Sequence, residues 1–314
     1  MFIYFPYLRG RQNELLALRE LVQKNLLSPN ILPVVEPVKF SPTLAKTLET
    51  FIRNKHSIAL ICNPAVGDFV KDLNQADNDN KIKKSINDSL SNECIIKAGI
   101  MKKNTAQMVK GWSKQFQPCV IINTDREWLE EYCKVFSVQS PSYTLIPDKS
   151  AFRRRVSGNK ILFEDRFIKR ERNSNYADHP DELFSEDHLD FEEDEFNGFG
   201  DYSIIGSDYM ESGFAPYAVA IHIVYFDKND SLRIHHFVSK SNEDPQNPAK
   251  KFYEAVEQLA LWVKKNPIYE TEGLKALLEH YEKQTYPGLG SIKKLSLMHH
   301  LELMTRYLDG KDYK

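Results

Sequence analysis

Short apolar runs alternate with longer amphipathic stretches along most of this chain. Eight runs, each ending at or beside a polar residue, occupy residues 4–9, 31–36, 58–63, 95–97, 120–123, 143–148, 160–165 and 201–205. Continuous apolar runs that alternate with helices are typical of strands in a buried parallel sheet. Eight such runs at roughly even spacing predict an α/β protein of the (β/α)8 or TIM-barrel type, which we expect to form one domain over residues 1–314.

The remaining elements are predicted by local signals between and after these runs. Residues 14–24 have the leucine periodicity of an amphipathic helix, and similar stretches separate most of the other runs. Near the last predicted strand, two alternating segments flank a short polar turn, which predicts a β-hairpin insertion within residues 214–240. Further helical patterns predict a C-terminal helical extension over residues 270–314.

Polar residues at the ends of the predicted strands are the candidates for a functional site, because active sites of (β/α)8 barrels lie at the carboxyl ends of the strands. Carboxylates gathered there can bind a hard divalent ion such as Mg2+, or divide into a general acid and a general base. They can also pair with nearby arginines as part of the scaffold. We assign catalytic roles to Glu36, Glu164, Asp165 and Asp201, and substrate binding to Arg9, Lys97, Asn123 and Arg166.

Two histidines stand on the arms of the predicted hairpin. Its turn brings His222 to within about one pairing step of His235. Side chains that face the same side of a hairpin could supply a base or metal ligands. His222 also alternates with apolar neighbours, as a hydrogen-bonded structural histidine in a strand does. The pattern leaves both interpretations open.

Charge is distributed unevenly around the last predicted strands. An acidic insertion is expected over residues 174–197, and residues 178–195 contain ten acidic residues and no lysine or arginine. Such a segment is predicted to be either a mobile, solvated loop or a lid that a polyanion such as nucleic acid displaces. The acidic segment would either cover a nearby basic group as a lid or neutralise it internally. This basic group consists of residues 153–155 with Arg166, Lys169, Arg170 and Arg172.

The overall composition narrows the classes of function. The 314 residues carry a net charge of −2, which gives no general attraction to nucleic acid or to anionic membranes. No apolar stretch reaches the ~18 residues needed to cross a bilayer, and the start of the chain lacks the pattern of a signal peptide. The four cysteines are widely spaced, which favours reduced core residues over a disulfide or a metal site. We therefore expect a soluble, cytoplasmic protein that does not bind membranes.

Three phrases of the sequence resemble the bacterial and phage "beta protein" family. Residues 4–14 read YFPYLRGRQNE, residues 32–37 read LPVVEP, and residues 200–202 read GDY. Members of that family open with a Y-x-P-x-L-[KR]-x-[KR]-x-x-E phrase and contain a P-[LI]-[IV]-E strand and a G-D-Y phrase. The resemblance implies a barrel-like fold and a link to bacteriophage biology, in phages or in bacterial mobile-element or antiviral defence loci. It implies no particular reaction, and no catalytic residue carries over from it.

Two functions fit the predicted site. The first is a metal-assisted hydrolase or phosphodiesterase of antiviral defence, in which Arg9 and Lys97 hold a phosphate-bearing substrate such as a nucleotide or nucleic acid. The second is a non-catalytic recognition module that binds a phage or host protein partner. Convergence of at least three carboxylates in an open pocket would favour the enzyme. Pairing of these carboxylates with arginines would favour the module.

Overall fold

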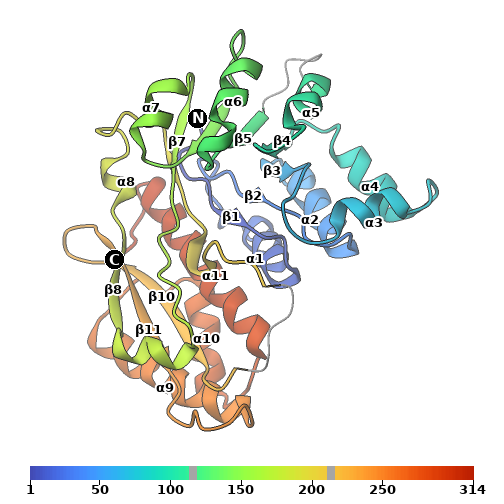
Figure 1. The fold of residues 1–314 in the computed structure, drawn as a ribbon. Coiled ribbons are helices and arrows are strands. Elements are labelled where there is room, and N and C mark those ends of the chain that lie inside the picture. Colours follow the sequence, from blue (N-terminus) through green and yellow to red (C-terminus); the bar gives the residue numbers. More distant parts are fainter. Residues whose placement is uncertain (113–118, 211–215) are drawn as a thin grey trace. The chain divides into compact units, whose positions relative to one another are not determined.

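The computed structural model describes residues 1–112, 119–210 and 216–314. Eight parallel strands form one barrel sheet in which each strand pairs with the next (Figure 1). They are β1 (Tyr7–Leu8), β2 (Val34–Val35), β3 (Ile58–Ile61), β4 (Ile95–Ile100), β5 (Cys119–Ile122), β6 (Tyr143–Ile146), β7 (Lys160–Phe163) and β9 (Phe199–Gly200). The sheet closes where Tyr4 bridges to Phe199 and the Phe5 amide donates to the Phe199 carbonyl at 2.9 Å. The predicted (β/α)8-type barrel is therefore confirmed.

Helices alternate with these strands. At the start of α2 (Pro42–Arg53), the Ser41 hydroxyl accepts a hydrogen bond from the Leu44 amide at 3.2 Å. Pro42 occupies the first turn, where a backbone N–H has no partner within the helix, so the proline removes no helical hydrogen bond. Leu48 and Phe51 then contribute to its buried face. The helices of this part of the chain are α1 (Gln12–Gln23), α2 (Pro42–Arg53), α3 (Phe69–Gln75), α4 (Lys81–Ser89), α5 (Thr105–Trp112), α6 (Leu129–Val135), α7 (Ser150–Arg155) and the short α8 (Asp187–Asp190).

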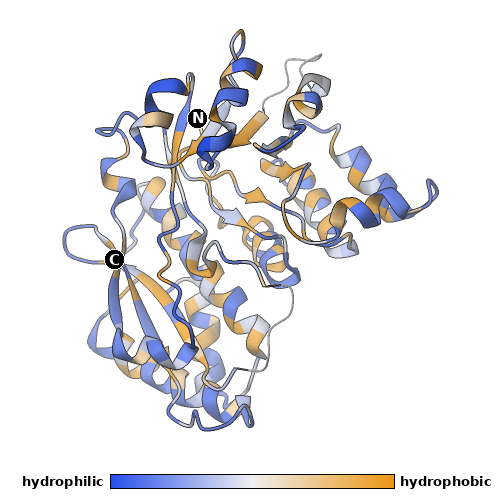
Figure 2. Ribbon diagram, viewed as in Figure 1, coloured by the Kyte–Doolittle hydropathy of each residue, from blue (hydrophilic) through white to orange (hydrophobic). Residues whose placement is uncertain are grey.

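Alternate residues of the strands fill the interior of the barrel, and most of the barrel strands are coloured as hydrophobic in Figure 2. In β4, Ile96 and Ala98 belong to this interior cluster, so Lys97 between them lies on the outer face of the strand. The same alternation decides which residues at the strand ends can face the mouth of the barrel. The interior residues are Phe5, Tyr7, Leu32, Val34, Ala59, Ile61, Ile96, Ala98, Val120, Ile122, Leu145, Ile161 and Phe163.

The chain divides into two compact units, whereas the sequence predicts a single domain over residues 1–314. The first unit holds the barrel and comprises Met1–Leu15, Pro29–Asp165 and Asp187–Tyr202. The second comprises Leu16–Ser28, Arg166–Glu186 and Ser203–Lys314. It has a core of its own, because its hairpin, a strand from the acidic insertion and its helices bury apolar side chains against one another. Among these side chains are Phe252, Leu259, Leu277 and Leu301, each at most 1% exposed.

The second unit contains an antiparallel sheet of three strands in the order β10, β11, β8. The predicted hairpin near the last barrel strand is confirmed as β10 (Ala220–Phe226) and β11 (Leu232–Val238). The third strand, β8 (Asp181–Ser185), comes from the acidic insertion. The extra C-terminal helices that the sequence predicts are present as α10 (Glu272–Glu282) and α11 (Leu289–Leu308), preceded by α9 (Pro248–Lys265).

The acidic insertion over residues 174–197 has regular structure, although its composition predicts a mobile loop as one possibility. Its middle part forms β8, which pairs with β11, and its later part contains α8. Phe184, Phe191 and Phe196 are each at most 8% exposed. These three aromatic side chains bury enough apolar surface to hold the segment, in spite of its negative charge.

Two barrel strands differ from their predicted limits. β4 continues to Ile100, so Lys97 lies within the strand and not at its end. The eighth strand is β9, and residues Ser203–Ile205, which we expected to be part of it, form a short 3-10 helix instead. Gly200 allows this strand to lie close to the first one, since a Cβ atom there would lie 2.5 Å from the Phe5 carbonyl oxygen. Asp201 and Tyr202 therefore follow the strand directly.

Within the described ranges, none of the helices combines the length and the apolar character needed to cross a membrane. The longest, α11, carries the buried histidines His299 and His300 and the buried acid Glu302.

His299 makes the stability of the second unit dependent on pH. Its ring nitrogens contact the Thr271 hydroxyl at 2.8 Å and the Val224 carbonyl at 2.7 Å, and complete burial lowers its pKa from 6.5 to about 4. Between these two values the unfolded chain binds a proton here and the folded chain does not, so stability is lost as the pH falls from 6.5 to about 4. We expect a loss of up to about 3 kcal/mol from this residue.

Urea unfolding at a series of pH values would measure this effect. His299→Gln keeps one donor and one acceptor but does not titrate, so the pH dependence of its free energy of unfolding should be flatter in this range. An unchanged slope would show that His299 is not the group responsible.

Candidate functional site

A fully buried carboxylate organises the mouth of the barrel. Glu36, which directly follows β2, is 0% exposed. Its Oε2 accepts hydrogen bonds from the Tyr7 hydroxyl at 2.7 Å and from the Arg9 guanidinium. Its Oε1 accepts from the backbone amides of Ala65 and Val66 at 2.6 and 3.3 Å. Four donors from two neighbouring segments therefore compensate a charge that would otherwise be costly to bury.

The Arg9 guanidinium lies between two tyrosines as well as beside Glu36. Its central carbon is 5.3 Å from the centre of the Tyr7 ring and 5.6 Å from that of Tyr202. These are cation–π distances, and the Tyr202 ring also packs on Phe163 at 4.9 Å. With only 12% of its side chain exposed, Arg9 is held in one place at the mouth.

Lys102 adds a second cation at the same end of the barrel. It follows β4, is half-buried, and donates to the Pro64 carbonyl at 2.9 Å. Burial lowers the pKa of its ammonium group, while the nearby Glu36 acts in the opposite direction. Within the part of the chain that the structure describes, Lys102 forms no ion pair with a carboxylate. The loop of residues 64–66 thus binds Lys102 through a carbonyl and Glu36 through two amides.

Two glycines allow these segments to approach so closely. Gly10 has a φ of +61°, and a Cβ there would lie 3.0 Å from the Glu36 carbonyl oxygen. Gly67 has a φ of +78°, and a Cβ would lie 2.2 Å from the Val38 carbonyl oxygen. Any other residue at Gly67 would have to push the loop away from Val38, and with it the two amides that hold Glu36.

Of the predicted catalytic carboxylates, the structure places Glu36, Glu164 and Asp165 around the mouth. Glu164 accepts a hydrogen bond from the Asp148 amide at 3.0 Å. Asp165 is exposed. All three raise the pKa of Tyr202, which reaches about 12 chiefly because the phenol is buried, while Arg9 lowers it. Three carboxylates therefore lie near one phenol.

Asp201 has a different environment. It is 3% exposed and accepts a hydrogen bond from the Tyr4 hydroxyl at 2.9 Å. The Tyr4 ring stacks on Phe199 at 5.0 Å, and Tyr4 is not among the residues of the barrel interior. This contact therefore connects the first and last strands of the barrel where the sheet closes. In the described ranges, no three His, Cys, Asp or Glu side chains are grouped as a metal site requires, and Mg2+ binding stays a prediction.

The predicted substrate-binding residues separate into several environments. Arg9 contacts Glu36 at the mouth, as described above. Lys97 lies on the outer face of β4, where it lowers the pKa of the Cys62 thiol while burial raises that pKa to about 11. Arg166 belongs to the second compact unit. Asn123 follows β5 directly and is 1% exposed.

Asn63 also follows a strand, but its amide is used to build the barrel. Its Oδ1 accepts from the Ile100 amide at 2.9 Å, and its Nδ2 donates to the Ile100 carbonyl at 2.8 Å. The side chain thus continues the hydrogen bonding between β3 and β4 after the backbone pairing has ended. Sequence reasoning did not identify Tyr7, Tyr202 or Lys102 at the mouth, although Tyr7 and Tyr202 lie in the YFPYLR and GDY phrases.

The histidines of the hairpin lie within one pairing step of each other, as the sequence predicts. His222 is in register with His236, the residue next to His235, and the Nδ1 atoms of His222 and His236 are 2.7 Å apart. The Tyr176 ring lies 4.7 Å from both rings, and Glu182 accepts from His236 at 3.2 Å. Burial lowers the pKa of both histidines, which are therefore neutral packing residues at pH 7.

The basic group of the sequence is divided and partly neutralised. Residues 153–155 belong to the first compact unit and residues 166–172 to the second. Arg153 pairs with Asp148 at 3.2 Å and Lys169 with Asp208 at 3.2 Å. Arg170 pairs with Glu182 of the acidic insertion, as internal neutralisation predicts.

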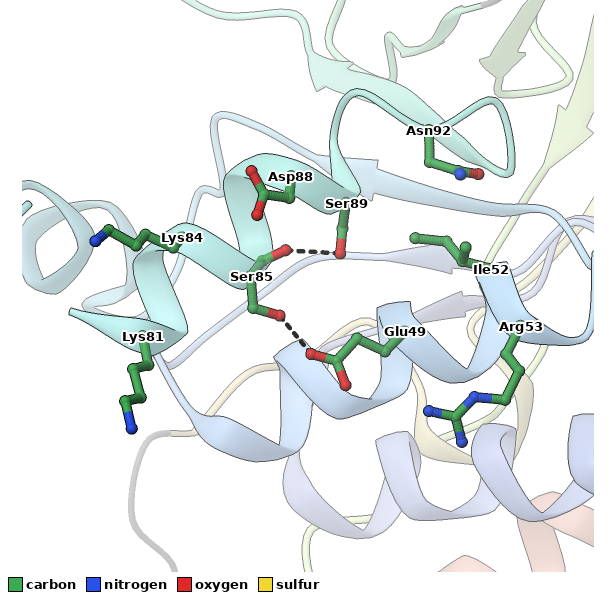
Figure 3. Close-up of a pocket in the computed structure, with 9 residues that line it drawn as sticks. All are labelled: Glu49, Ile52, Arg53, Lys81, Lys84, Ser85, Asp88, Ser89 and Asn92. Atoms are coloured by element: carbon green, nitrogen blue, oxygen red, sulfur yellow. Dashed lines mark hydrogen bonds between the residues drawn. The ribbon is translucent and has the colours of Figure 1, made fainter. Parts of the chain in front are cut away.

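A surface hollow of about 580 Å3 lies between α2 and α4 in the helical layer of the barrel (Figure 3). Its charged side chains include Arg53, Lys81 and Asp88. The Ser85 hydroxyl donates a hydrogen bond to the Glu49 carboxylate at 2.6 Å, drawn as a dashed line in Figure 3. The hollow is open and its acids and bases are mixed, so it has no single charge preference.

The chain matches no known protein-family model, and it has no match among curated proteins.

Loss of the Glu36 charge should destabilise the barrel. Glu36→Gln keeps the size of the side chain but leaves Arg9 without its buried counter-charge, and it places an NH2 donor where Glu36 has an acceptor oxygen. Breaking a buried ion pair in this way costs about 3–5 kcal/mol, which we expect as the fall in the free energy of unfolding. Urea denaturation would measure it, with Glu130→Gln on the exposed side of α6 as the control. Equal stability of the two variants would contradict the role assigned to Glu36.

Proposed function

We propose that the mouth of the barrel binds a phosphate-bearing molecule, such as a nucleotide or a nucleic-acid end, and that its primary activity is recognition. The observation that carries this proposal is Lys102, a half-buried ammonium group near Glu36 that has a carbonyl as its partner and no ion pair with any of the described residues. A cation withdrawn from water gains most from an anion placed against it. Phosphate oxygens suit both an ammonium and a guanidinium group.

The state of the carboxylates favours recognition over metal-assisted hydrolysis. Glu36 already accepts four hydrogen bonds and pairs with an arginine. Asp201 is bonded to Tyr4, and Glu164 to a backbone amide. A carboxylate committed to such partners has fewer lone pairs left for a metal ion or for proton transfer. Pairing of this kind is what a binding module requires, because it makes the site rigid before the ligand arrives.

A hydrolase is the second candidate, and one observation favours it. Asp165, Glu36 and Glu164 all act on the pKa of the Tyr202 phenol, so their charges lie near one point of the mouth. A divalent ion that entered with a phosphate-bearing ligand would reduce their mutual repulsion. In this alternative the exposed Asp165 is the residue that would contact the ion.

The biological setting forms part of the proposal. The YFPYLR, LPVVEP and GDY phrases support a role in phage biology or in a bacterial antiviral defence or mobile-element locus, with a phage or host protein as a further partner. All three phrases supply residues of the mouth: Tyr7 and Arg9 come from the first, and Tyr202 from the third. The second supplies Glu36 itself.

Phosphate binding should depend on Lys102. We expect pyrophosphate and nucleotides to raise the thermal unfolding temperature, because a ligand that binds only the folded state stabilises it. Lys102→Met should weaken binding roughly tenfold to hundredfold, the value of one or two hydrogen bonds to a charged group. Lys97→Met is the matched control, since it removes the same charge from the outer face of β4, the strand that Lys102 follows. Equal losses in the two variants, or no binding by the unaltered protein, would contradict the proposal.

Mg2+ and Mn2+ in the same thermal assay test the hydrolase alternative. It requires a metal-dependent shift that Asp165→Asn abolishes and a slow release of product from the bound nucleotide. A shift that is the same in the Asp165→Asn variant would remove Asp165 from that role.

A further inference from the structure

The three-stranded sheet of the second unit has an open edge. β8 is its outer strand, because it pairs with β11 and with no other strand that the structure describes (Figure 1). The His236 amide donates to the Pro180 carbonyl at 2.8 Å, which sets the hydrogen-bonding register between the two strands. Successive residues of a strand direct their backbone groups to opposite sides, so those of Glu182 face β11. Those of Asp181 and Leu183 therefore face outward.

The outward backbone groups are available to a further strand. Among the described residues, none forms a hydrogen bond with the backbone amide or carbonyl of Asp181 or Leu183 on this side. Leu183 is also 47% exposed, although it is a large apolar residue within a sheet. An edge strand with unpaired backbone groups can act as a template to which an extended peptide adds as the next strand.

The charge around β8 decides which kind of strand fits. Residues 173–186 contain four acids and no lysine or arginine. The two acids within β8 are already paired with arginines. The other two, Asp178 and Glu186, lie on either side of the strand, are exposed, and form no ion pair with a described residue. Charge complementarity therefore favours a basic partner.

A second copy of the chain fits this edge poorly. Pairing of two β8 strands would bring acidic side chains against acidic side chains, which is destabilising. The register also shifts between Leu232 and Arg233, and Phe184 is left unpaired as a bulge. Bulges at sheet edges limit the pairing of one edge with another. A short strand that pairs with Asp181 and Leu183, before the bulge, is compatible with this geometry.

We propose that the free edge of β8 binds an extended segment of a partner protein in which basic and apolar residues alternate. The backbone of that segment bonds to Asp181 and Leu183, and an apolar side chain contacts Leu183. Its basic residues lie toward Asp178 and Glu186. This edge belongs to the second compact unit and shares no residue with the mouth of the barrel, so it does not depend on the phosphate site.

A short acetylated peptide of alternating lysine and valine is the probe. In nuclear magnetic resonance spectra of the protein, we expect saturable shifts of the Asp181 and Leu183 amides and slower hydrogen exchange at both. The same peptide N-methylated at its valines keeps its charge and side chains but cannot donate toward β8. It should bind roughly tenfold more weakly, because it leaves backbone acceptors without donors. A peptide of alternating glutamate and valine should also bind at least roughly tenfold more weakly.

Leu183→Pro tests the protein side of the same contact. It removes the outward N–H and leaves the bonds between β8 and β11 in place, since proline is tolerated where the N–H of an edge strand faces solvent. We expect it to weaken binding of the lysine–valine peptide roughly tenfold. Leu183→Ala is the matched control, because it shortens the side chain but keeps the N–H, and it should lose clearly less affinity.

Three results would overturn the proposal. Equal binding of the N-methylated and unmodified peptides would show that no strand is added, and this comparison does not depend on how Leu183→Pro folds. The absence of saturable binding by the lysine–valine peptide would show that the edge does not accept a basic strand. A dimer of the protein that Leu183→Pro dissociates would assign the edge to a second copy of the chain instead.

Discussion

The mouth of the barrel depends on the burial of one negative charge. A carboxylate that is moved from water into a protein interior loses several kcal/mol of solvation, so Glu36 can be buried only if all its partners are in place. These partners are the Tyr7 hydroxyl, the Arg9 guanidinium and the two amides of the loop after β3. The requirement fixes three neighbouring strand ends relative to one another. It also fixes Arg9, whose position between two tyrosine rings follows from its bond to Glu36.

Electrostatic balance then explains why the other charged groups differ in role. Glu36 and Arg9 compensate each other, and Asp201 and Glu164 have partners in the scaffold. Lys102 is the cation that this network leaves without an acidic partner among the described residues. The pKa of Lys102 is lowered because burial disfavours its ammonium charge, and the nearby Glu36 offsets this effect only in part. A phosphate group would supply the missing negative charge.

The sequence was sufficient to predict the barrel, the hairpin and the positions of Arg9 and Glu36 directly after strands, because apolar runs and the residues that follow them are visible in local periodicity. It was insufficient where long-range packing decides. Lys97 was assigned to a strand end since its run is interrupted by a charge, but pairing with β3 and β5 extends β4 to Ile100. Lys102 lies in the turn beyond, where no apolar pattern indicates a site. Part of the acidic insertion forms the strand β8 because it pairs with the edge of β11, and composition alone does not reveal this pairing.

The ionisation of Lys102 tests the central claim most directly. Nuclear magnetic resonance of the lysine side chains, with Lys102→Met to assign the signal, would give its pKa in the free protein and with pyrophosphate bound. The account predicts a pKa below the usual 10.5 in the free protein and a rise when the anion binds. An ordinary pKa that does not respond to pyrophosphate would mean that Lys102 is a solvated surface charge, and the mouth would then have no anion site built around it.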